Sequence, residues 1–549
     1  MKKIMKNIKL LCLVLIILCI TGGLVGCDKG NSNALIISVA NNGNGYSWVE
    51  KIAEKFTAET GIEVEVKGTA VPTIVDTSLP SGPNNNDIDI YFPNASYYSV
   101  LANGKNYVKG FNYETAILDI SDVYDYEVTG YGEVMKLRDI LSETAIEACT
   151  YDRNGKQYFV PYISNSSGIV YNREMFDQNN YSVPLTTDGL VKLCEQIKAD
   201  HGKNTYAIVY AGNNGYSRYV GNVWWAQYEG KENYENFWKG IYDGSYADGY
   251  KNFAQQGRKE TALMLGTLFD SGNGFSHPAS VQNTFTQAQL SFLEGDAFMT
   301  ISGDWIENEM KGNFAADSLD IALMRTPVIS ALSTKLSYYA DGKTEYNDLS
   351  AAKKAKYDAA LQEIIKYVDG TLTEKPTSVD GLTITDADIA KVKTARITKI
   401  ADATCGFICA YSNKIEEAKK FMAYIFNKDC QEIMLKETNG AYGALKAEYP
   451  MDYFDAFDSL SRMQKAKLEL VTDEVVEVSN CNNCAMSYAG GLVLEWDTGS
   501  GAKFEGVVGL PHDSKSYKSG LQIFQETYNT YSTGNTWVNM LKNAGLFDE

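Results

Sequence analysis

The stretch Leu35-Ile-Ile-Ser-Val-Ala-Asn-Asn-Gly-Asn-Gly45 begins the part of the chain that decides its fold class. Its first six residues are almost all apolar, which is typical of a strand buried on both faces. Apolar residues then recur at helical spacing over 48–56, and Gly61 is placed to end that helix. Alternating apolar and charged residues over 62–67 predict a second strand. Strand, helix and strand with short connections predict a parallel sheet and an α/β fold.

Alternating strands and helices continue along most of the chain. Apolar runs predict further strands at 89–92, 158–162, 168–171, 206–210 and 297–301. Helical spacing predicts helices at 188–198, 287–294 and 415–426, and one that begins at Trp305. Residues 328–400 are poorer in apolar positions, and we interpret them as an inserted helical segment.

The first 27 residues have the pattern of a secretory signal. Four lysines precede an apolar run over 10–20 that is shorter than the roughly 20 residues of a membrane-spanning helix. Leu24-Val-Gly-Cys27 resembles a bacterial lipobox, in which the cysteine is acylated and becomes the N-terminus. We therefore expect residues 1–26 to be a lipoprotein signal peptide, Cys27 to carry lipid such as palmitate, and the polar residues 27–33 to be a tether. An ordinary signal peptide or a single anchoring helix is the alternative.

Composition excludes some classes of partner. Residues 27–549 are long enough for two or three domains, and 44% hydrophobic and 22% charged residues are ordinary for a globular chain. Because the leader holds four lysines and no acid, its removal takes the net charge from −19 to −23. Nucleic-acid binding needs clustered Lys and Arg, so we expect no such partner.

Seven cysteines remain after Cys27, and an odd number cannot all pair within one chain. Cys481-Asn-Asn-Cys484 has spacing that fits a local disulfide, two buried thiols, a redox pair or half of a metal site. A zinc site would need a second such pair or nearby histidines, and the chain has three histidines in all. We expect no metal and no cofactor.

Four segments carry a resemblance to a known family. They are Glu50-Lys-Ile-Ala-Glu-Lys-Phe-Thr-Ala-Glu-Thr-Gly-Ile62, Val160-Pro-Tyr-Ile-Ser-Asn-Ser-Ser-Gly-Ile-Val-Tyr-Asn172, Phe292-Leu-Glu-Gly-Asp-Ala-Phe-Met-Thr-Ile-Ser-Gly-Asp-Trp305 and Ala410-Tyr-Ser-Asn-Lys-Ile-Glu-Glu-Ala-Lys-Lys-Phe421. In this order they resemble the family 1 extracellular solute-binding proteins of bacterial ABC sugar transporters. The chain is longer than usual for that family, and the excess falls in 328–400 and after Pro450.

The resemblance implies a two-lobed, periplasmic-binding-protein-like (type II) clamp with an inserted helical segment. We expect lobe one at 34–162 plus 328–445, with 328–400 as its insertion, and lobe two at 163–327 plus 446–549. It implies a monomer that is lipid-anchored at the outer face of the bacterial cytoplasmic membrane. A carbohydrate, most simply an oligosaccharide, would bind between the lobes and be delivered to ABC permease subunits.

Candidate ligand-binding residues follow from the strand ends. In open α/β sheets, ligands bind beyond the carboxyl ends of the strands, which selects the loops 41–46, 93–98, 164–167 and 302–305. Amides and carboxylates match sugar hydroxyls, and aromatic faces cover a sugar ring. One of two adjacent tryptophans, 224 and 225, is expected at the site with its neighbour in the core, and Trp48 fits the core at least as well as the site. The candidates are Asn42, Tyr46, Trp48, Asn94, Asn165, Trp224, Trp225, Asp304 and, first among them, Trp305.

Other functions remain open at this stage. Tyr97-Tyr98 and Tyr338-Tyr339 are compatible with a ferric-iron binder, and a peptide or polyamine binder fits the same fold. An adhesin in which 328–400 does the binding is a further class. A secreted carbohydrate-active enzyme would need only two carboxylates. HExxH and GxSxG are missing and the aspartic-protease motif occurs once, at Asp497-Thr-Gly-Ser500, so we expect no enzyme.

Overall fold

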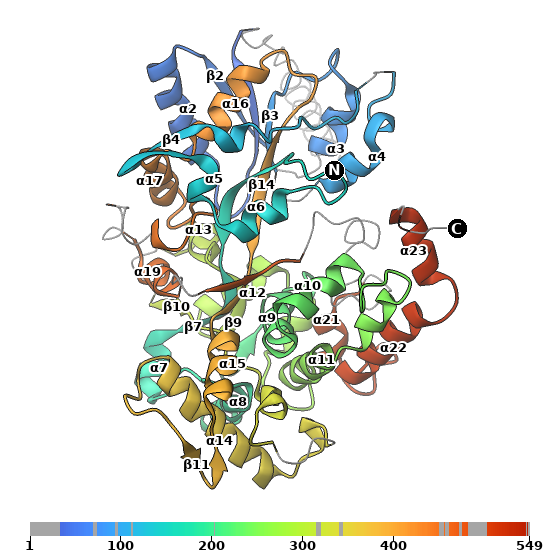
Figure 1. Cartoon of the computed structure of the whole chain (residues 1–549). Coiled ribbons are helices and arrows are strands. Elements are labelled where there is room, and N and C mark those ends of the chain that lie inside the picture. The colour runs from blue at the N-terminus through green and yellow to red at the C-terminus, as the bar shows by residue number, and fades with distance from the viewer. Residues whose placement is uncertain are drawn as a thin grey trace, which may run out of the picture.

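Two sheets organise the molecule, each with its own hydrophobic core. The computed structural model describes residues 33–69, 74–93, 97–110, 113–202, 204–314, 320–339, 344–449, 455, 460–470, 475–480, 502–544 and 546. In Figure 1 the first sheet lies in the upper half and the second in the lower half, with helices around both. The predicted α/β architecture with two lobes is confirmed.

Lobe one is built on a five-stranded sheet in the order β2-β1-β3-β14-β6. The strands are β1 (Leu35–Ala40), β2 (Val64–Thr69), β3 (Ile90–Phe92), β6 (Val160–Asn165) and β14 (Asp402–Ile408). The pairs β1–β2 and β1–β3 are parallel, as the opening of the sequence predicts. By contrast β14 runs antiparallel to both of its neighbours because it returns from the other lobe.

The first helix covers this sheet because its apolar residues share one face. Helix α2 (Ser47–Thr60) buries Trp48, Ile52 and Phe56 in the lobe-one core. It ends at Gly61, whose φ of 74° is the left-handed conformation that glycine adopts without strain. Lobe one further contains β4 (Glu127–Tyr131), β5 (Glu133–Lys136), α3 (Ile74–Ser78), α4 (Tyr98–Asn103), α5 (Leu137–Ile140), α6 (Glu143–Cys149), α16 (Ile415–Tyr424) and α17 (Lys428–Glu437).

Lobe two is built on a four-stranded sheet in the order β10-β7-β9-β8. The strands are β7 (Ser167–Asn172), β8 (Tyr206–Val209), β9 (Ala297–Gly303) and β10 (Ile321–Leu323). Its helices include α7 (Arg173–Asn179), α8 (Thr187–His201), α9 (Arg218–Glu229), α10 (Lys231–Lys239), α11 (Gln256–Phe269), α12 (Phe285–Leu293) and α13 (Ile306–Met310). The strand β9 is buried along its whole length, which explains why it contains no charged residue.

The segment 328–400 belongs to lobe two, whereas we expected it in lobe one. Its elements are α14 (Ala351–Val368), β11 (Ser378–Val379), β12 (Leu382–Thr383), α15 (Asp386–Arg396) and β13 (Thr398–Ile400). Apolar residues of α14 and α15, such as Ile364 and Val392, join the hydrophobic core that contains Trp224. The prediction was wrong because helical spacing shows that a face is buried but not which sheet it is buried against.

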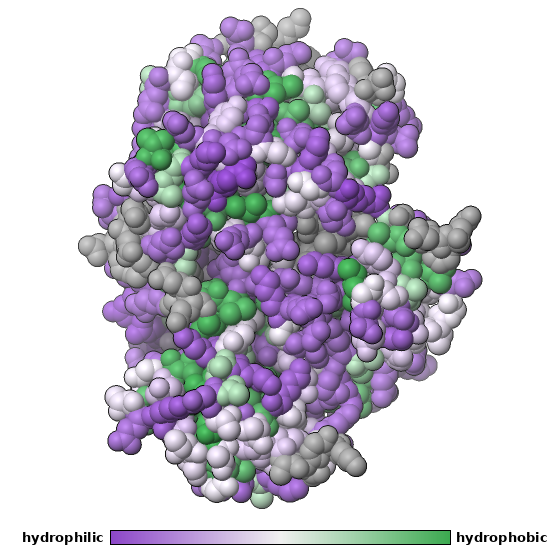
Figure 2. Space-filling model, viewed as in Figure 1, coloured by the Kyte–Doolittle hydropathy of each residue, from purple (hydrophilic) through white to green (hydrophobic). Residues whose placement is uncertain are grey.

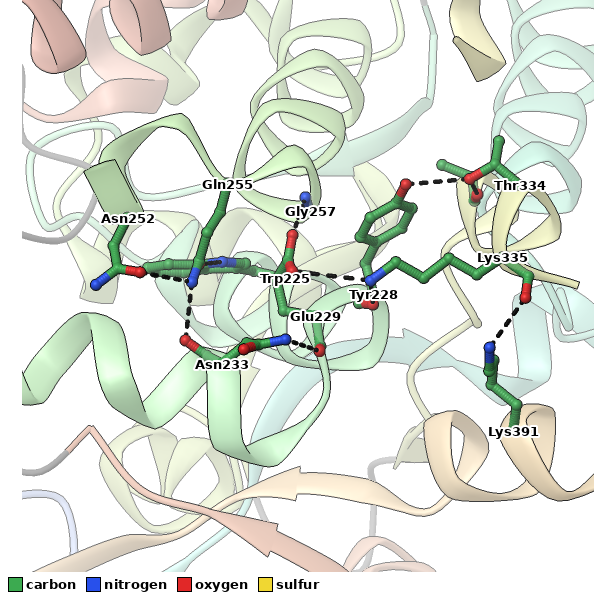
Figure 3. A network of polar contacts seen from close by, with 11 residues as sticks. Trp225, Tyr228, Glu229, Asn233, Asn252, Gln255, Gly257, Thr334, Lys335 and Lys391 are labelled. Carbon is green, nitrogen blue, oxygen red and sulfur yellow. Dashed lines mark hydrogen bonds and ion pairs between the residues drawn. The ribbon is translucent and has the colours of Figure 1, made fainter. Parts of the chain in front are cut away.

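Polar contacts at the end of α9 fix this segment to lobe two (Figure 3). The Lys335 ammonium lies 3.7 Å from Glu229 Oε2 and donates to the Tyr228 carbonyl at 2.6 Å. Lys391 in turn donates to the Lys335 carbonyl at 2.9 Å. The two lysines therefore connect α15, the segment before α14 and the C-terminal end of α9.

The region after residue 446 divides between the lobes, whereas we expected all of it in lobe two. Tyr449 and Leu460 are in the lobe-one core, and α19 (Arg462–Glu469) lies at the boundary, against β10. Beyond it, β15 (Val476–Val478) pairs with β13 of lobe two. The helices α21 (Phe504–Val508), α22 (Gly520–Ser532) and α23 (Thr536–Ala544) pack on lobe two, on the right of Figure 1.

Several predictions lie outside the described residues: the signal peptide, the lipidated Cys27, most of the tether, and the pair Cys481 and Cys484. In the part of the chain that the structure describes, no helix combines the length and apolar character needed to cross a bilayer.

Candidate functional site

Three of the four predicted loops meet where the lobes face each other. Asn44, in the loop after β1, donates through Nδ2 to Oδ1 of Asn165 at the end of β6, at 3.4 Å. The backbone amide of Asp304, after β9, donates to the Ser166 carbonyl at 2.9 Å. The carboxyl ends of β1, β6 and β9 therefore converge, which is where an open α/β sheet places its ligands.

The loop after β1 lies directly against helix α13 of lobe two. A Cβ atom added to Gly43 would come within 2.8 Å of Glu309 Oε1 and 3.0 Å of the Trp305 Cβ. The amide of Asn308 donates to the Gly43 carbonyl. Only glycine fits this contact, so the backbone of lobe one touches the residues that follow β9 in lobe two.

Trp305 is half-buried and lies over the end of β9. A Cβ atom on Gly303 would fall 2.2 Å from Cζ3 of the indole ring, so glycine at 303 makes room for the ring. The ring contacts Tyr219 edge to face, with centroids 5.5 Å apart and an interplanar angle of 66°. Of the predicted tryptophans, Trp305 is the one that lies at the lobe boundary and is only half-buried.

The residues around the start of α9 supply further aromatic groups that sequence reasoning missed. Tyr216 and Tyr219 are half-buried, with ring centroids 4.9 Å apart, and the guanidinium of Arg218 lies 5.1 Å from the Tyr219 centroid. Phe285 stacks on Tyr216 at 6.3 Å. With Trp305 these residues form one aromatic group in lobe two. The signal was the run Tyr216-Ser-Arg-Tyr219, which leads into a helix after a glycine- and asparagine-rich stretch.

Glu309 adds a carboxylate beside this aromatic group. Its Oε2 accepts a hydrogen bond from Gln289 Nε2 at 2.7 Å. Desolvation raises the pKa of Glu309 to about 7, and the hydrogen bond from Gln289 opposes that shift. The group therefore changes charge near neutral pH while it faces the lobe-one loop.

Asp304 is not available as a ligand group, in contrast to our expectation. Its side chain is 3% exposed and pairs with the ammonium of Lys467, which is 1% exposed. Lys467 also donates to the Gly440 carbonyl of lobe one at 3.0 Å, and Gln464 donates to the Asp304 carbonyl at 2.8 Å. Helix α19 thus ties the end of β9 to a loop of lobe one.

A second carboxylate strengthens the same connection. Glu307 Oε2 accepts from Ser461 Oγ at 2.6 Å and from Asn439 Nδ2 at 2.9 Å. Burial raises the pKa of Glu307, and these hydrogen bonds oppose the shift. The buried charges of Asp304, Glu307 and Lys467 therefore join α13, α19 and the 439–440 loop.

Three predicted tryptophans are core residues. Trp48 is 1% exposed and stacks on Tyr162, with centroids 5.7 Å apart. Trp224 is fully buried and donates to the Pro327 carbonyl at 3.0 Å. Trp225 is also fully buried and donates to Gln255 Oε1 at 2.7 Å (Figure 3). All three rings are covered, and the N–H groups of Trp224 and Trp225 are bonded to protein acceptors. None of the three can contact a ligand, so the expectation that one of Trp224 and Trp225 lines the site was wrong.

The predicted polar residues have different roles. Asn165 is 8% exposed and holds Asn44, so it supports the loop after β1. Asn42 is half-buried, and its Oδ1 accepts a hydrogen bond from the backbone N–H of Asn44 at 2.9 Å. Tyr46 is half-buried, and its ring lies over Gly68. Asn94 lies outside the described residues. Asn42 and Tyr46 thus remain candidates on the lobe-one side.

The tyrosine pairs considered for iron lie apart. Tyr97 and Tyr98 are buried in the lobe-one core, and Tyr338 and Tyr339 are buried in the lobe-two core. Among the described residues, no group of three or more His, Cys, Asp and Glu side chains could hold a metal ion.

Comparison with known proteins identifies the family. The family model for bacterial extracellular solute-binding proteins matches residues 51–455. A multiple sugar-binding protein of Streptococcus mutans is 27% identical over 61% of this chain and 72% of its own length. Among solved structures, a probable secreted solute-binding lipoprotein of Streptomyces coelicolor superimposes with a TM-score of 0.55 at 14% identity, covering 92% of this chain and 100% of that one. A chitin oligosaccharide binding protein gives 0.54 at 14% identity, covering 90% and 96%. The chain belongs to the bacterial extracellular solute-binding protein family, whose members bind solutes and are not enzymes.

Proposed function

We propose that this protein is the lipid-anchored substrate-binding subunit of an ABC importer and that it binds an oligosaccharide between its two lobes. The observation that carries the proposal is the half-buried aromatic group of Tyr216, Tyr219 and Trp305, which lies where the lobe-one loop meets α13. The match to a relative named as a multiple sugar-binding protein supports the same class of ligand.

The chemistry of the site fits a sugar better than a peptide, polyamine or metal ion. An aromatic face covers the C–H side of a pyranose ring, and edge-to-face packing between Trp305 and Tyr219 holds the faces at an angle. Arg218 and Glu309 supply a donor and an acceptor for vicinal hydroxyls. On the lobe-one side, Asn42 and Tyr46 add an amide and a phenol.

Binding would close the lobes around the sugar by a hinge motion. The chain crosses between the lobes at 165–167, where β6 leads into β7, and at 400–402, where β13 leads into β14. Short crossings of this kind can absorb a rotation without disturbing either core. The closed form would then be recognised by the permease, and other subunits would hydrolyse ATP.

We further propose that the protein acts as a monomer at the outer face of the membrane. The face seen in Figure 2 is mostly hydrophilic, with apolar side chains in small, separate groups. Stable dimers usually bury a larger continuous apolar area.

Calorimetric titration of the mature chain with a panel of oligosaccharides tests the proposal. We expect saturable binding of at least one of them, and at least a tenfold weaker affinity for Trp305→Ala because the stacking surface is removed. Tyr242→Ala is the matched control, since Tyr242 is 41% exposed, lies in the loop between α10 and α11, and is not part of the aromatic group. Equal affinities of the wild type and Trp305→Ala would remove this residue from the site, and binding of a peptide, polyamine or iron in place of every sugar would refute the ligand class.

A further inference from the structure

Two cysteines from distant parts of the sequence meet in the lobe-one core. The Sγ atoms of Cys149 and Cys405 lie 3.5 Å apart, although the residues are 256 positions apart in sequence. Cys149 is the last residue of α6, and Cys405 lies in β14. Both side chains are buried, at 0% and 7% exposed.

The surroundings of the pair show that the contact is part of the packing. Helix α6 lies against β6, and Cys405 lies opposite Pro161 of β6, at the point where the pairing register of β14 shifts. The buried ring of Tyr124, whose hydroxyl donates to the Phe159 carbonyl at 2.7 Å, interacts with both sulfurs. A register shift changes the direction in which the side chains of a strand point, and here it brings Cys405 toward α6.

We propose that Cys149 and Cys405 are a disulfide-forming site that links α6 to β14 when the protein folds outside the cytoplasm. The oxidant is a small-molecule disulfide. One thiolate attacks it to form a mixed disulfide and release one small thiol. The second cysteine sulfur then displaces the other small thiol, so that two protein thiols are oxidised and one small disulfide is reduced to two thiols.

The timing of this reaction follows from the burial of the thiols. Desolvation holds the pKa of Cys149 well above its usual range, so the folded core contains very little of the nucleophilic thiolate. Exchange therefore takes place while lobe one is forming, before Tyr124 and β6 close over the sulfurs. Once made, the bond is shielded from reductants by the same packing.

The bond would act on the strand that returns the chain from lobe two. It closes a loop that contains the whole of the lobe-two sheet, and cross-linking so long a loop restricts the unfolded chain. It also fixes the lobe-one end of the second crossing against α6. The inference concerns lobe one alone and does not depend on the identity of the ligand.

Peptide mapping of the wild-type mature chain tests the site without any substitution. The reduced protein is unfolded in denaturant, refolded with reduced and oxidised glutathione, alkylated under denaturing conditions without reduction, digested and analysed by mass spectrometry. We expect a linked peptide that contains Cys149 and Cys405, with alkylated Cys194 and Cys430 as internal controls. Recovery of alkylated Cys149 and Cys405, or of either one linked to another cysteine, would overturn the proposal.

Thermal unfolding gives the second readout. We expect the oxidised wild type to unfold about 5 °C above the same protein kept reduced. The difference should vanish in Cys149→Ala and in Cys405→Ala. It should persist in Cys194→Ala, which removes a buried thiol of the lobe-two core without touching the pair. A difference that survives in both pair variants would refute the assignment. If either variant fails to fold, the peptide map of the wild type still decides whether Cys149 and Cys405 are linked.

Discussion

Two tryptophan-bearing regions of lobe two look alike in sequence and differ in structure. Trp224 and Trp225 occupy the middle of α9, are fully buried, and donate their N–H groups to protein acceptors. Trp305 follows β9, is the residue at the N-terminal end of α13, and is only half-buried. A helix wrapped by neighbours buries every aromatic residue on its inner turns, whereas a residue just past a strand end lies at the edge of the core. Position relative to a strand end therefore indicates which tryptophan stays only half-buried better than aromatic content does.

The largest expected effect separates the two regions by stability. Trp225→Ala should lower the free energy of unfolding by about 4 kcal/mol, because it creates a cavity among Tyr234, Phe237 and Trp238. Urea denaturation measures this loss. The comparison variant, Trp305→Ala, should cost less stability because Trp305 is half-buried, whereas Trp225 is fully buried. Equal losses in the two variants would contradict the distinction between a core and a site tryptophan.

The next effect concerns the ion pair that supports Trp305. Lys467→Met should cost about 3 kcal/mol of stability, because it leaves the carboxylate of Asp304 buried without its cation. Arg462→Met, on the same helix, is the matched control: its pair with Asp320 is 66% exposed on the arginine side and should be worth less than about 1 kcal/mol. Denaturant unfolding of both variants checks the ranking, and a loss that is no greater at Lys467 would show that α19 does not anchor the lobe boundary.

A smaller effect depends on pH and comes from Glu309. Its pKa of about 7 lies above the 4.5 of an exposed glutamate, so the folded state keeps a proton that the unfolded chain has already released. Its contribution to stability is therefore greatest below pH 4.5 and falls as the pH rises to about 7. Between pH 5 and pH 8, the free energy of unfolding should fall by roughly 2 kcal/mol more in the wild type than in Glu309→Gln.

Urea unfolding at several pH values tests this expectation. Glu294→Gln, at an exposed position after α12, is the control and should follow the wild-type curve. If the Glu309→Gln curve also runs parallel to that of the wild type, the buried carboxylate does not titrate between pH 5 and pH 8.

Much of the fold could be predicted from local patterns. The run at 35–40 is β1, the helical spacing from 48 onward is α2, and the predicted helices in 328–400 appear as α14 and α15. Short connections also predicted the parallel pairing of β1 with β2. The lobe that contains 328–400 was assigned wrongly, since the partner of an apolar face is a long-range choice that no local pattern records.

The candidate site could be predicted in part. Strand ends selected the loops around Asn42, Asn165 and Trp305, and the structure brings these loops together. Tyr216 and Tyr219 were missed because no local pattern shows that they are less buried than the tryptophan pair a few residues later, which was predicted instead. The ion pair of Asp304 with Lys467 joins residues more than 160 positions apart, and Glu309 owes its raised pKa to packing around it.

The sequence by itself determined the class of sheet, the order of its elements and the strand ends at which a ligand can bind, because period and turn residues are local properties. Tertiary structure alone decided which aromatic rings stay uncovered, which carboxylate meets a cation, and which two cysteines touch. Those outcomes depend on what each side chain packs against, and burial, desolvation and charge pairing are properties of neighbours that the chain brings together only when it folds.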